Sequence, residues 1–183
     1  MIITIAGPAA SGKGTLAKMF ADALSLPHYD FGLLFRALAY ANLEIQHLNV
    51  QDGRIIFSDK DITDQLRTEE IGLLAANMAS QLKDLAMSLV RHVNFVCDGR
   101  TCGSEIYPNA DFKFYITASA QDRINRRSLQ HGNKQAFLLR EKIDQERLVL
   151  PKDAVVVDTT GKSISECLEE MISYEKHFTF VRE

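Results

Sequence analysis

Short runs of apolar and β-branched residues alternate along this chain with longer segments in which apolar residues recur every three or four positions. The first pattern predicts buried strands, and the second predicts amphipathic helices. Ile2–Ile5 is the first strand of this kind, and the apolar run Ala154–Val157 begins the last. We expect five short strands, at residues 2–5, 28–30, 94–97, 112–117 and 154–158. Because helices separate them, they should form one parallel sheet that is covered on both faces.

The expected helices are defined by their apolar faces and by the residues that begin or end them. Leu16, Phe20 and Leu24 share one face of the first helix, and Pro27 should end it because proline cannot donate to the helical ladder. Ser163 should cap the last helix, which carries an apolar stripe. The expected helices are 16–26, 33–43, 68–80, 82–92, 119–129, 135–147 and a final helix after Ser163.

One segment departs from this alternation of strands and helices. Residues 45–50 and 54–58 are two strand-like runs on either side of a Gln-Asp-Gly turn, which together predict a hairpin. A second short turn at residues 59–61 precedes Ile62. The sequence therefore predicts a small β insertion in an otherwise α/β chain.

The composition is that of an ordinary globular protein and argues against two kinds of partner. The 183 residues suit one domain, and 46% hydrophobic with 25% charged residues is enough for a proper core. A net charge of −3 provides no general attraction to nucleic acid or to an anionic membrane. No apolar run approaches the ~18 residues that span a membrane. We expect no nucleic-acid and no membrane partner.

The first residues and the cysteines favour the cytoplasm. The chain starts directly on a core strand, so we expect no signal or transit peptide. Its three cysteines, Cys97, Cys102 and Cys167, are odd in number and have no C-x-x-C spacing, so we expect reduced thiols.

A glycine-rich loop connects the first strand to the first helix. Gly7, Gly12 and Lys13 have the spacing G-x-x-x-x-G-K of the phosphate-binding loop of nucleoside triphosphatases and kinases. Glycines let successive backbone N–H groups turn inward around a phosphate, and the helix adds its positive N-terminal dipole. The alternative is a chance glycine loop, but strand, loop, lysine and helix all lie where phosphate binding requires them. Gly14 follows the lysine and the hydroxyl comes at Thr15, a GKGT variant that is typical of kinases for nucleoside monophosphates.

Polar residues also follow three other expected strands. Asp30 ends the second strand, Asp98-Gly99-Arg100 follows the third, and Asp158-Thr159-Thr160 follows the last. The carboxyl ends of parallel strands meet at one edge of a sheet, and ligands bind there. Each group alone has a plainer explanation, since Asp30, for example, can simply cap the next helix. Their convergence with the glycine-rich loop predicts a site at this edge.

The expected helix at residues 135–147 is dense in charge. Arg140, Asp144 and Arg147 are spaced i, i+4 and i+7 and therefore share one face. The plain explanation is a solvated face with ion pairs. Beside a phosphate-binding loop, such arginines can instead neutralise a phosphoryl group during its transfer. Arg126 and Arg127, one helix earlier, can do the same or stack on adenine, or they can be ordinary surface arginines.

With these motifs the chain resembles the bacterial cytidylate kinases, which move the γ-phosphate of ATP onto CMP or dCMP. The phosphate-binding loop alone is shared by many families, whereas its combination with D-G-R…G…(F/Y)-P is specific to this one. The matching segments run in the family's order and cover nearly the whole chain: ITIAGPAASGKGTLAK, LPHYDFGLLFRALA, DITDQLRTEEIG, DGRTCGSEIYPNADFKFYITAS, RRSLQ and DAVVVDTTGKSISE.

The resemblance implies an α/β, three-layer P-loop kinase fold. Its parts would be a five-stranded parallel sheet, a small β insertion that binds the nucleoside monophosphate (NMP), and a short helical lid. Residues 1–183 would form a single domain, with a core of residues 1–43, 94–134 and 150–183, an insertion of about residues 44–93 and a lid of about residues 135–149.

The resemblance also implies functions for individual residues. Thr15 would bind Mg²⁺, Lys83 is aligned with an arginine that helps to read cytosine, and Asp158–Thr160 matches a loop near adenine. The ATP phosphates would be held by Gly7, Pro8, Ala9, Ala10, Ser11, Gly12, Lys13, Gly14 and Thr15. The catalytic residues would be Lys13, Arg140, Asp144 and Arg147. The acceptor would be bound by Asp30, Arg36, Lys83, Asp98, Arg100 and Asp144.

Three residues depart from the family pattern. Phe31 replaces the Ser or Thr of D-(S/T)-G, whose hydroxyl reads the base, and Thr101 replaces the last aspartate of D-G-R-D. Ile143 replaces an arginine of the lid that grips phosphate. Loss of a partner for a buried polar group costs about 1–3 kcal/mol, although the ring of Phe31 can instead stack on the base. These departures leave the ATP side intact and concern the acceptor.

The sequence therefore predicts a kinase that uses ATP and Mg²⁺ to convert CMP and dCMP to the diphosphates, as a cytoplasmic monomer. Two alternatives stay open. One is a P-loop kinase for a different small acceptor, which Phe31, Thr101 and Ile143 favour. The other is a nucleotide-binding protein with little turnover, which the missing lid arginine favours.

Overall fold

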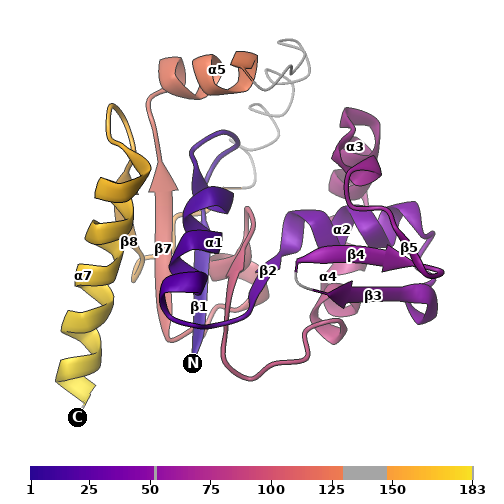
Figure 1. Cartoon of the computed structure of the whole chain (residues 1–183), viewed down its shortest axis with the longest axis horizontal. Coiled ribbons are helices and arrows are strands. Elements are labelled where there is room, and N and C mark those ends of the chain that lie inside the picture. Colours follow the sequence, from indigo (N-terminus) through magenta and orange to yellow (C-terminus); the bar gives the residue numbers. More distant parts are fainter. Residues whose placement is uncertain (52, 130–147, 183) are drawn as a thin grey trace.

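The centre of the molecule is a five-stranded parallel sheet (Figure 1). The computed structural model describes residues 1–51, 53–129 and 148–182. The sheet has the spatial order β2-β6-β1-β7-β8, and every neighbouring pair is parallel. The five expected strands are confirmed, each bound lying within one residue of the prediction. The strands are β1 (Ile2–Ala6), β2 (His28–Asp30), β6 (Phe95–Asp98), β7 (Phe112–Thr117) and β8 (Val155–Asp158).

Alternate strand residues face two hydrophobic cores, one on each side of the sheet. Ile5 and Phe114 belong to the core beneath α1 and α7, whereas Phe95 and Cys97 belong to the core beneath α2 and α4. The expected three-layer α/β architecture is confirmed, and Figure 1 shows α1 and α7 side by side. The covering helices are α1 (Lys13–Ala23), α2 (Phe31–Tyr40), α4 (Ala79–Ser88) and α7 (Ile164–Arg182).

Four helices end earlier than their sequence pattern predicts. The helix α3 (Glu69–Asn77) ends at Asn77 rather than at Ser80, and α4 spans Ala79–Ser88 rather than residues 82–92. The other two, α1 and α2, end where the backbone becomes left-handed. The helix α1 ends at Ala23 because Ser25 takes a left-handed conformation (φ 54), so the prediction that Pro27 ends it is wrong. The helix α2 ends at Tyr40 rather than at Leu43, since Asn42 and Leu43 have φ values of 48 and 69. In both cases apolar residues beyond the helix still pack on the core, which is why the pattern overran the helix.

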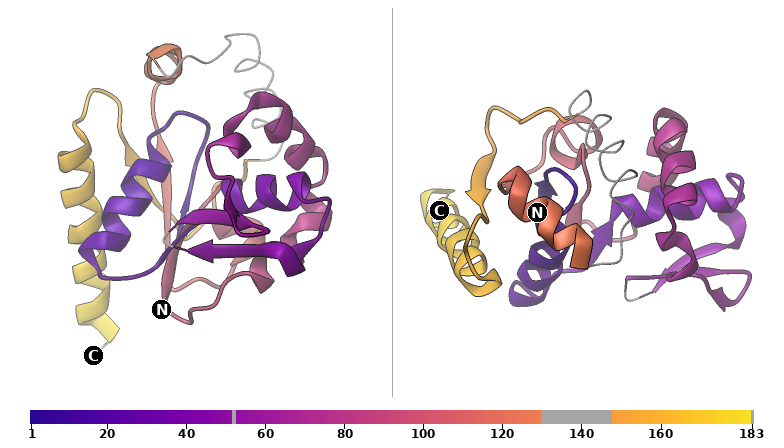
Figure 2. Two further views of the ribbon diagram at one scale, coloured as in Figure 1. Left: turned by 45° about the vertical axis from the view of Figure 1, so that its right-hand side comes forward. Right: turned by 90° about the horizontal axis from the view of Figure 1, so that it is seen from above.

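The β insertion is confirmed and contains a third strand, but residues 45–47, which were expected in its first strand, form a 3₁₀ turn instead. The antiparallel hairpin β3 (Leu48–Gln51) and β4 (Arg54–Phe57) is extended by a third strand, β5 (Lys60–Asp61). Lys60 and Asp61 were expected in a turn, but the turn lies at Ser58 and Asp59, whose φ values of 47 and 64 suit a tight hairpin. Figure 2 shows this small sheet grouped with α2, α4 and α3 (Glu69–Asn77) on the β2 side of the molecule.

The last two helices of the described residues lie before and after the segment expected to form the lid. The helix α5 (Ala120–Leu129) lies beyond the carboxyl end of β7 (Figure 1). Ser163 caps α7 as predicted, since its Oγ accepts a bond from Glu166 N (3.3 Å). The expected helix 135–147 lies outside the described residues, so the lid stays a prediction, as does the division into core and insertion. No described helix is long and apolar enough to cross a membrane.

Candidate active site

The polar residues at the strand ends lie along one edge of the sheet, as predicted. In the parallel register Asp98 stands beside both Ile5 and Asp30, and Asp158 stands beside Thr117. The glycine-rich loop leaves β1 at the same level (Figure 1). Segments that are far apart in the sequence therefore meet at the end of the sheet where α/β proteins bind ligands.

The backbone of the glycine-rich loop has the alternating conformation of an anion-binding nest. Ala10 (φ 58) and Gly12 (φ 92) are left-handed on either side of Ser11. Alternation of this kind turns successive N–H groups to one side. Gly7 (φ 146) approaches β7 so closely that a Cβ there would lie 2.1 Å from the carbonyl oxygen of Ile116. Only glycine fits at this position.

The loop ends at the N-terminus of α1, which no side chain of the described residues caps. Gly12 is the N-cap, no acidic residue stands in the first turn, and Leu16 N bonds to Gly12 O (3.0 Å). The Ser11 hydroxyl is buried and has no hydrogen-bond partner among the described residues. Lys13 Nζ reaches back across the loop to Pro8 O (3.4 Å). Uncapped N–H groups, a helix dipole and an ammonium group together fit a polyphosphate.

Gly14 and Thr15 explain the GKGT variant in structural terms. A Cβ at Gly14 would lie 3.6 Å from Asp98 Oδ2, so the first turn of α1 passes directly beside this carboxylate. Thr15 is exposed, which leaves its hydroxyl accessible to a bound metal ion. The described residues hold no cluster of three or more His, Cys, Asp or Glu that could bind a metal by itself. A Mg²⁺ ion would thus need phosphate oxygens and water as further ligands, as Mg²⁺ commonly does at nucleotide sites.

Two carboxylates and a histidine form the acidic side of the site. His28 Nε2 lies 2.8 Å from Asp98 Oδ1, and the Asp98 side chain is almost fully buried. Asp30 Oδ1 accepts a bond from Leu33 N (2.9 Å), so its role as a helix cap is confirmed. Burial raises the pKa of Asp30, and the charge of Asp98 raises it further, against the opposing effects of Leu33 N, His28 and Lys13. No sequence motif pointed to His28, although it shares a strand face with Asp30.

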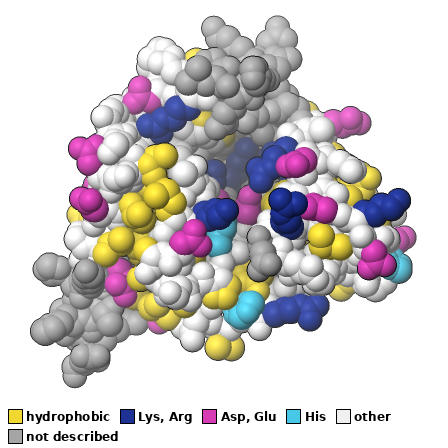
Figure 3. Space-filling model, in the orientation of Figure 1, with side chains coloured by type: hydrophobic (Ala, Val, Ile, Leu, Met, Phe, Trp, Pro, Cys, Tyr) yellow, Lys and Arg dark blue, Asp and Glu magenta, His cyan; other side chains and the backbone are white. Residues whose placement is uncertain are grey.

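The basic residues predicted for the acceptor lie on α2, on α4 and just after β6. Arg36, on α2, and Arg100, just after β6, are both partly buried. Lys83 is also partly buried and lies on α4, which packs against α2. Figure 3 shows Lys and Arg side chains around a hollow in the middle of this face of the molecule. The other predicted site residues, Arg140, Asp144 and Arg147, lie outside the described residues.

Phe31 does not face a ligand. It is 1% exposed and makes edge-to-face contacts with Tyr107 (5.8 Å between ring centroids) and Phe35 (6.2 Å). The suggestion that its ring stacks on the base is therefore wrong, because the ring is part of the core. Thr101 begins a π-helical turn, Cys102–Ile106, and its carbonyl oxygen accepts a bond from Glu105 N (2.8 Å).

Arg126 binds the protein rather than standing free for a ligand. Its Nη1 donates to Ser11 O (3.2 Å) and to Thr159 Oγ1 (2.8 Å), and its Nη2 donates to Thr159 O (2.8 Å). Arg123 Nη1 lies 3.5 Å from Ala9 O. The sequence pattern offered phosphate binding or adenine stacking for Arg126, and this contact with the loop backbone was missed. The side chain of Arg127 lies outside the described part of the chain.

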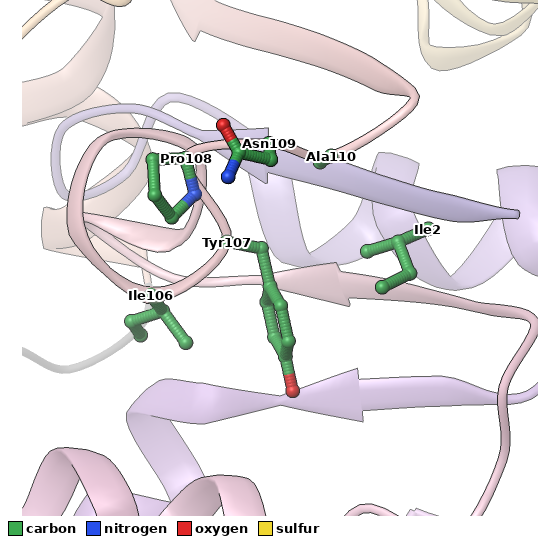
Figure 4. Close-up of a pocket in the computed structure, with 6 residues that line it drawn as sticks. All are labelled: Ile2, Ile106, Tyr107, Pro108, Asn109 and Ala110. Carbon is green, nitrogen blue, oxygen red and sulfur yellow. The ribbon is translucent and has the colours of Figure 1, made fainter.

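Two surface pockets lie away from the predicted site. One, of about 210 Å³, lies at the opposite end of β1 (Figure 4) and is lined by Ile2, Ile106, Tyr107, Pro108, Asn109 and Ala110. Another, of about 260 Å³, lies on the β3–β4 hairpin. Neither includes the glycine-rich loop or a predicted site residue.

Comparisons with known proteins identify a family for this chain. The model of the cytidylate kinase family matches residues 3–177. The cytidylate kinase of Halalkalibacterium halodurans is 34% identical over 96% of this chain and 97% of its own length. That of Clostridioides difficile is 30% identical over 94% and 97%. Both alignments are longer than 183 residues, so these relatives contain segments that this chain lacks.

A solved structure shares the fold at low sequence identity. The shikimate kinase from Bacteroides thetaiotaomicron superposes with a TM-score of 0.53 at 13% identity, over 96% of this chain and 98% of that one. At this identity the likeness concerns the arrangement of helices and strands and leaves the acceptor unspecified.

Proposed function

We propose that this chain, which belongs to the cytidylate kinase family, transfers the γ-phosphate of ATP to CMP and dCMP. The observation that carries the proposal is the meeting, at one sheet edge, of a loop that fits a triphosphate with the carboxylates Asp30 and Asp98. One side of this edge suits the donor, and the other offers charged groups to a second nucleotide. The cytidylate kinases that match almost end to end support CMP as that nucleotide.

The transfer needs positioning and charge neutralisation rather than covalent help from the protein. The bond between the γ-phosphorus and the β–γ bridging oxygen breaks, and a phosphate oxygen of CMP forms the new bond, which gives ADP and CDP. That oxygen is already an anion, so no general base is required. The loop N–H groups and Lys13 would hold the β- and γ-phosphates, where charge develops in the transition state.

The acceptor would lie across from the loop. Arg36 and Arg100 would hold its phosphate, and Asp98 would contact the same nucleotide, while Lys83 would reach the cytosine. Because Phe31 is buried in the core, it supplies neither a hydroxyl nor a ring to the base. Base recognition would therefore depend more on the remaining groups, and acceptor choice is the sharpest test of the proposal.

Mg²⁺ and the lid would complete the site. The Thr15 hydroxyl would bind the ion together with phosphate oxygens, and the ion would neutralise negative charge on the β- and γ-phosphates. Arg140, Asp144 and Arg147, through their resemblance to the family's lid, would contact the phosphates and the acceptor and exclude water from the reaction. We propose that the enzyme works in the cytoplasm as a monomer, and size-exclusion chromatography tests the second point.

A coupled assay of ADP release tests the acceptor. The purified full chain with ATP and Mg²⁺ is offered CMP, dCMP, UMP, AMP or shikimate in separate reactions. Turnover with CMP and dCMP, well above the other acceptors, is expected. Preference for another acceptor would show a P-loop kinase of different specificity. ATP binding without turnover on any acceptor would show a nucleotide-binding protein.

Replacement of Lys13 tests the loop itself. Lys13→Ala removes the ammonium group that neutralises the transferring phosphate, and removal of one such electrostatic contact typically costs ~10²–10³-fold in kcat. Lys18→Ala is the matched control, because Lys18 is an exposed lysine of the same helix. The thermal unfolding midpoint of both variants should equal that of the wild type. A Lys13→Ala enzyme with near wild-type kcat would refute the assigned role of the loop.

A further inference from the structure

The carbonyl oxygens of the glycine-rich loop are held from outside by two other segments. Ser11 O accepts bonds from Arg126 Nη1 (3.2 Å) and from Thr159 Oγ1 (2.9 Å). Ala9 O lies 3.5 Å from Arg123 Nη1. These contacts join the loop to α5 and to the turn after β8, across sequence separations of 114 to 148 positions. Long-range bonds to a loop that binds an anion call for a physical explanation.

The planarity of the peptide bonds in the loop explains these contacts. In a trans peptide the C=O and the following N–H point in opposite directions, and the described residues contain no cis peptide bond. Bonds that pull Ser11 O outward therefore turn the N–H of Gly12 inward. The Ala9 carbonyl sets the N–H of Ala10 in the same way. These are the two left-handed positions of the loop, so the nest depends on the orientation of these peptides.

Thr159 is well placed to fix that orientation because it is itself held rigidly. It is 4% exposed, its N donates to Thr117 O (2.9 Å), and its O accepts from Arg126 Nη2 (2.8 Å). Its hydroxyl accepts from Arg126 Nη1 and has one proton, which Ser11 O and Thr117 O share (2.9 and 3.1 Å). The hydroxyl is thus aimed at the loop by the groups around it.

We propose that Thr159 is a positioning residue for the donor triphosphate. Its hydroxyl, together with Arg126, holds the Ser11–Gly12 peptide in the orientation that points Gly12 N–H at a phosphate oxygen. Thr159 touches no reacting atom and acts through the loop. The inference rests on the proposed function only in so far as the bound anion is the triphosphate of ATP. An anion with the same spacing of phosphates therefore tests it without any acceptor.

The test compares three substitutions in the full chain. Thr159→Val keeps the β-branched shape and removes the hydroxyl, whereas Thr159→Ser keeps the hydroxyl. Thr4→Val is the matched control, because Thr4 is another buried threonine and its hydroxyl donates to Phe112 O (3.5 Å) and to no described atom of the loop. Tripolyphosphate and ATP binding are measured by calorimetry, the KM values of ATP and CMP by initial rates, and stability by thermal unfolding.

Thr159→Val should weaken tripolyphosphate binding and raise the KM of ATP about tenfold, the factor expected for loss of one buried hydrogen bond. The KM of CMP should change less than about twofold, because the acceptor side does not use this peptide. Thr159→Ser should restore tripolyphosphate binding. Thr4→Val should change stability without a selective loss of phosphate binding.

The proposal is overturned if Thr159→Val binds tripolyphosphate as tightly as the wild type. It is also overturned if the KM values of ATP and CMP rise equally, or if Thr159→Ser fails to restore binding. If Thr159→Val does not fold, Arg126→Lys replaces it in the test, because lysine keeps the charge but cannot bond to Ser11 O and Thr159 at the same time. Arg126→Lys must then weaken tripolyphosphate binding and raise the KM of ATP more than that of CMP. A wild type that binds tripolyphosphate but does not phosphorylate CMP would contradict the proposed function and leave this test intact.

Discussion

Replacement of Gly7 by alanine should damage both the fold and the donor site. Gly7 has a φ of 146, and a Cβ there would lie 2.1 Å from Ile116 O, a backbone atom of the sheet. Contacts of a real Cβ are essentially never shorter than 3.0 Å, so the loop must retreat from β7 by about 0.9 Å. Ile116 O lies in a strand that is hydrogen-bonded on both sides and cannot give way easily.

Two costs follow from this geometry. The glycine-only backbone conformation costs about 1–3 kcal/mol for alanine, and relief of the overlap costs about 1–3 kcal/mol more. Movement of the loop also displaces the N–H groups, and a misplacement of about 1 Å can cost ~10²-fold in rate. We expect the free energy of unfolding to fall by about 2–6 kcal/mol and kcat/KM for ATP to fall ~10²-fold or more.

A second glycine separates strain from collision. Gly161 has a φ of 65, but a Cβ added there would meet no atom within 4 Å, so Gly161→Ala carries backbone strain alone. Urea unfolding followed by circular dichroism, with ATP-dependent rates on the folded fraction, compares the two variants. If Gly7→Ala unfolds at the same urea concentration as Gly161→Ala and keeps its kcat/KM, the close approach of the loop to β7 is refuted.

Two further predictions concern the acidic side of the site. Burial and the charge of Asp98 raise the pKa of Asp30, so the folded state favours the protonated carboxyl. The stability that this preference provides is complete below the ordinary pKa of 3.8 and is lost as pH rises through the raised pKa. Asp30→Asn keeps a capping oxygen for Leu33 N and removes the buried negative charge, so it should increase the urea midpoint at pH 7. The same substitution should weaken turnover of CMP. An unchanged or lower midpoint would contradict the pKa argument. His28→Phe removes the partner of the buried Asp98 carboxylate, which should cost at least about 1–3 kcal/mol in urea unfolding and raise the KM of CMP. His28→Gln keeps a hydrogen-bond donor and should restore part of the stability and part of the affinity for CMP. Equal effects of His28→Phe and His28→Gln would show that the hydrogen bond to Asp98 is not the cause of these losses.

Much of the fold and half of the site follow from local patterns. Strands of three to six residues, a G-x-x-x-x-G-K loop and a capped final helix are each encoded within a few neighbouring residues, so periodicity and spacing suffice to find them. Because parallel strands align their carboxyl ends, Asp30, Asp98 and Asp158 could also be brought to one edge in advance. Helix ends were less predictable, since left-handed residues such as Ser25 and Asn42 stop a helix while the apolar pattern continues.

Local patterns are therefore enough to predict the sheet, the phosphate-binding loop and the class of chemistry. The way in which that loop is held, and the burial of Phe31, depend on contacts that form only in the folded chain. Phe31 looked like a site residue by its position, yet packing against Tyr107 places it in the core. Arg126 and Thr159 lie 115 and 148 positions from Ser11, and no local pattern reports a hydrogen bond across such a separation. Contacts of this kind exist only once the chain has folded, because the sheet brings the ends of β1, β7 and β8 together.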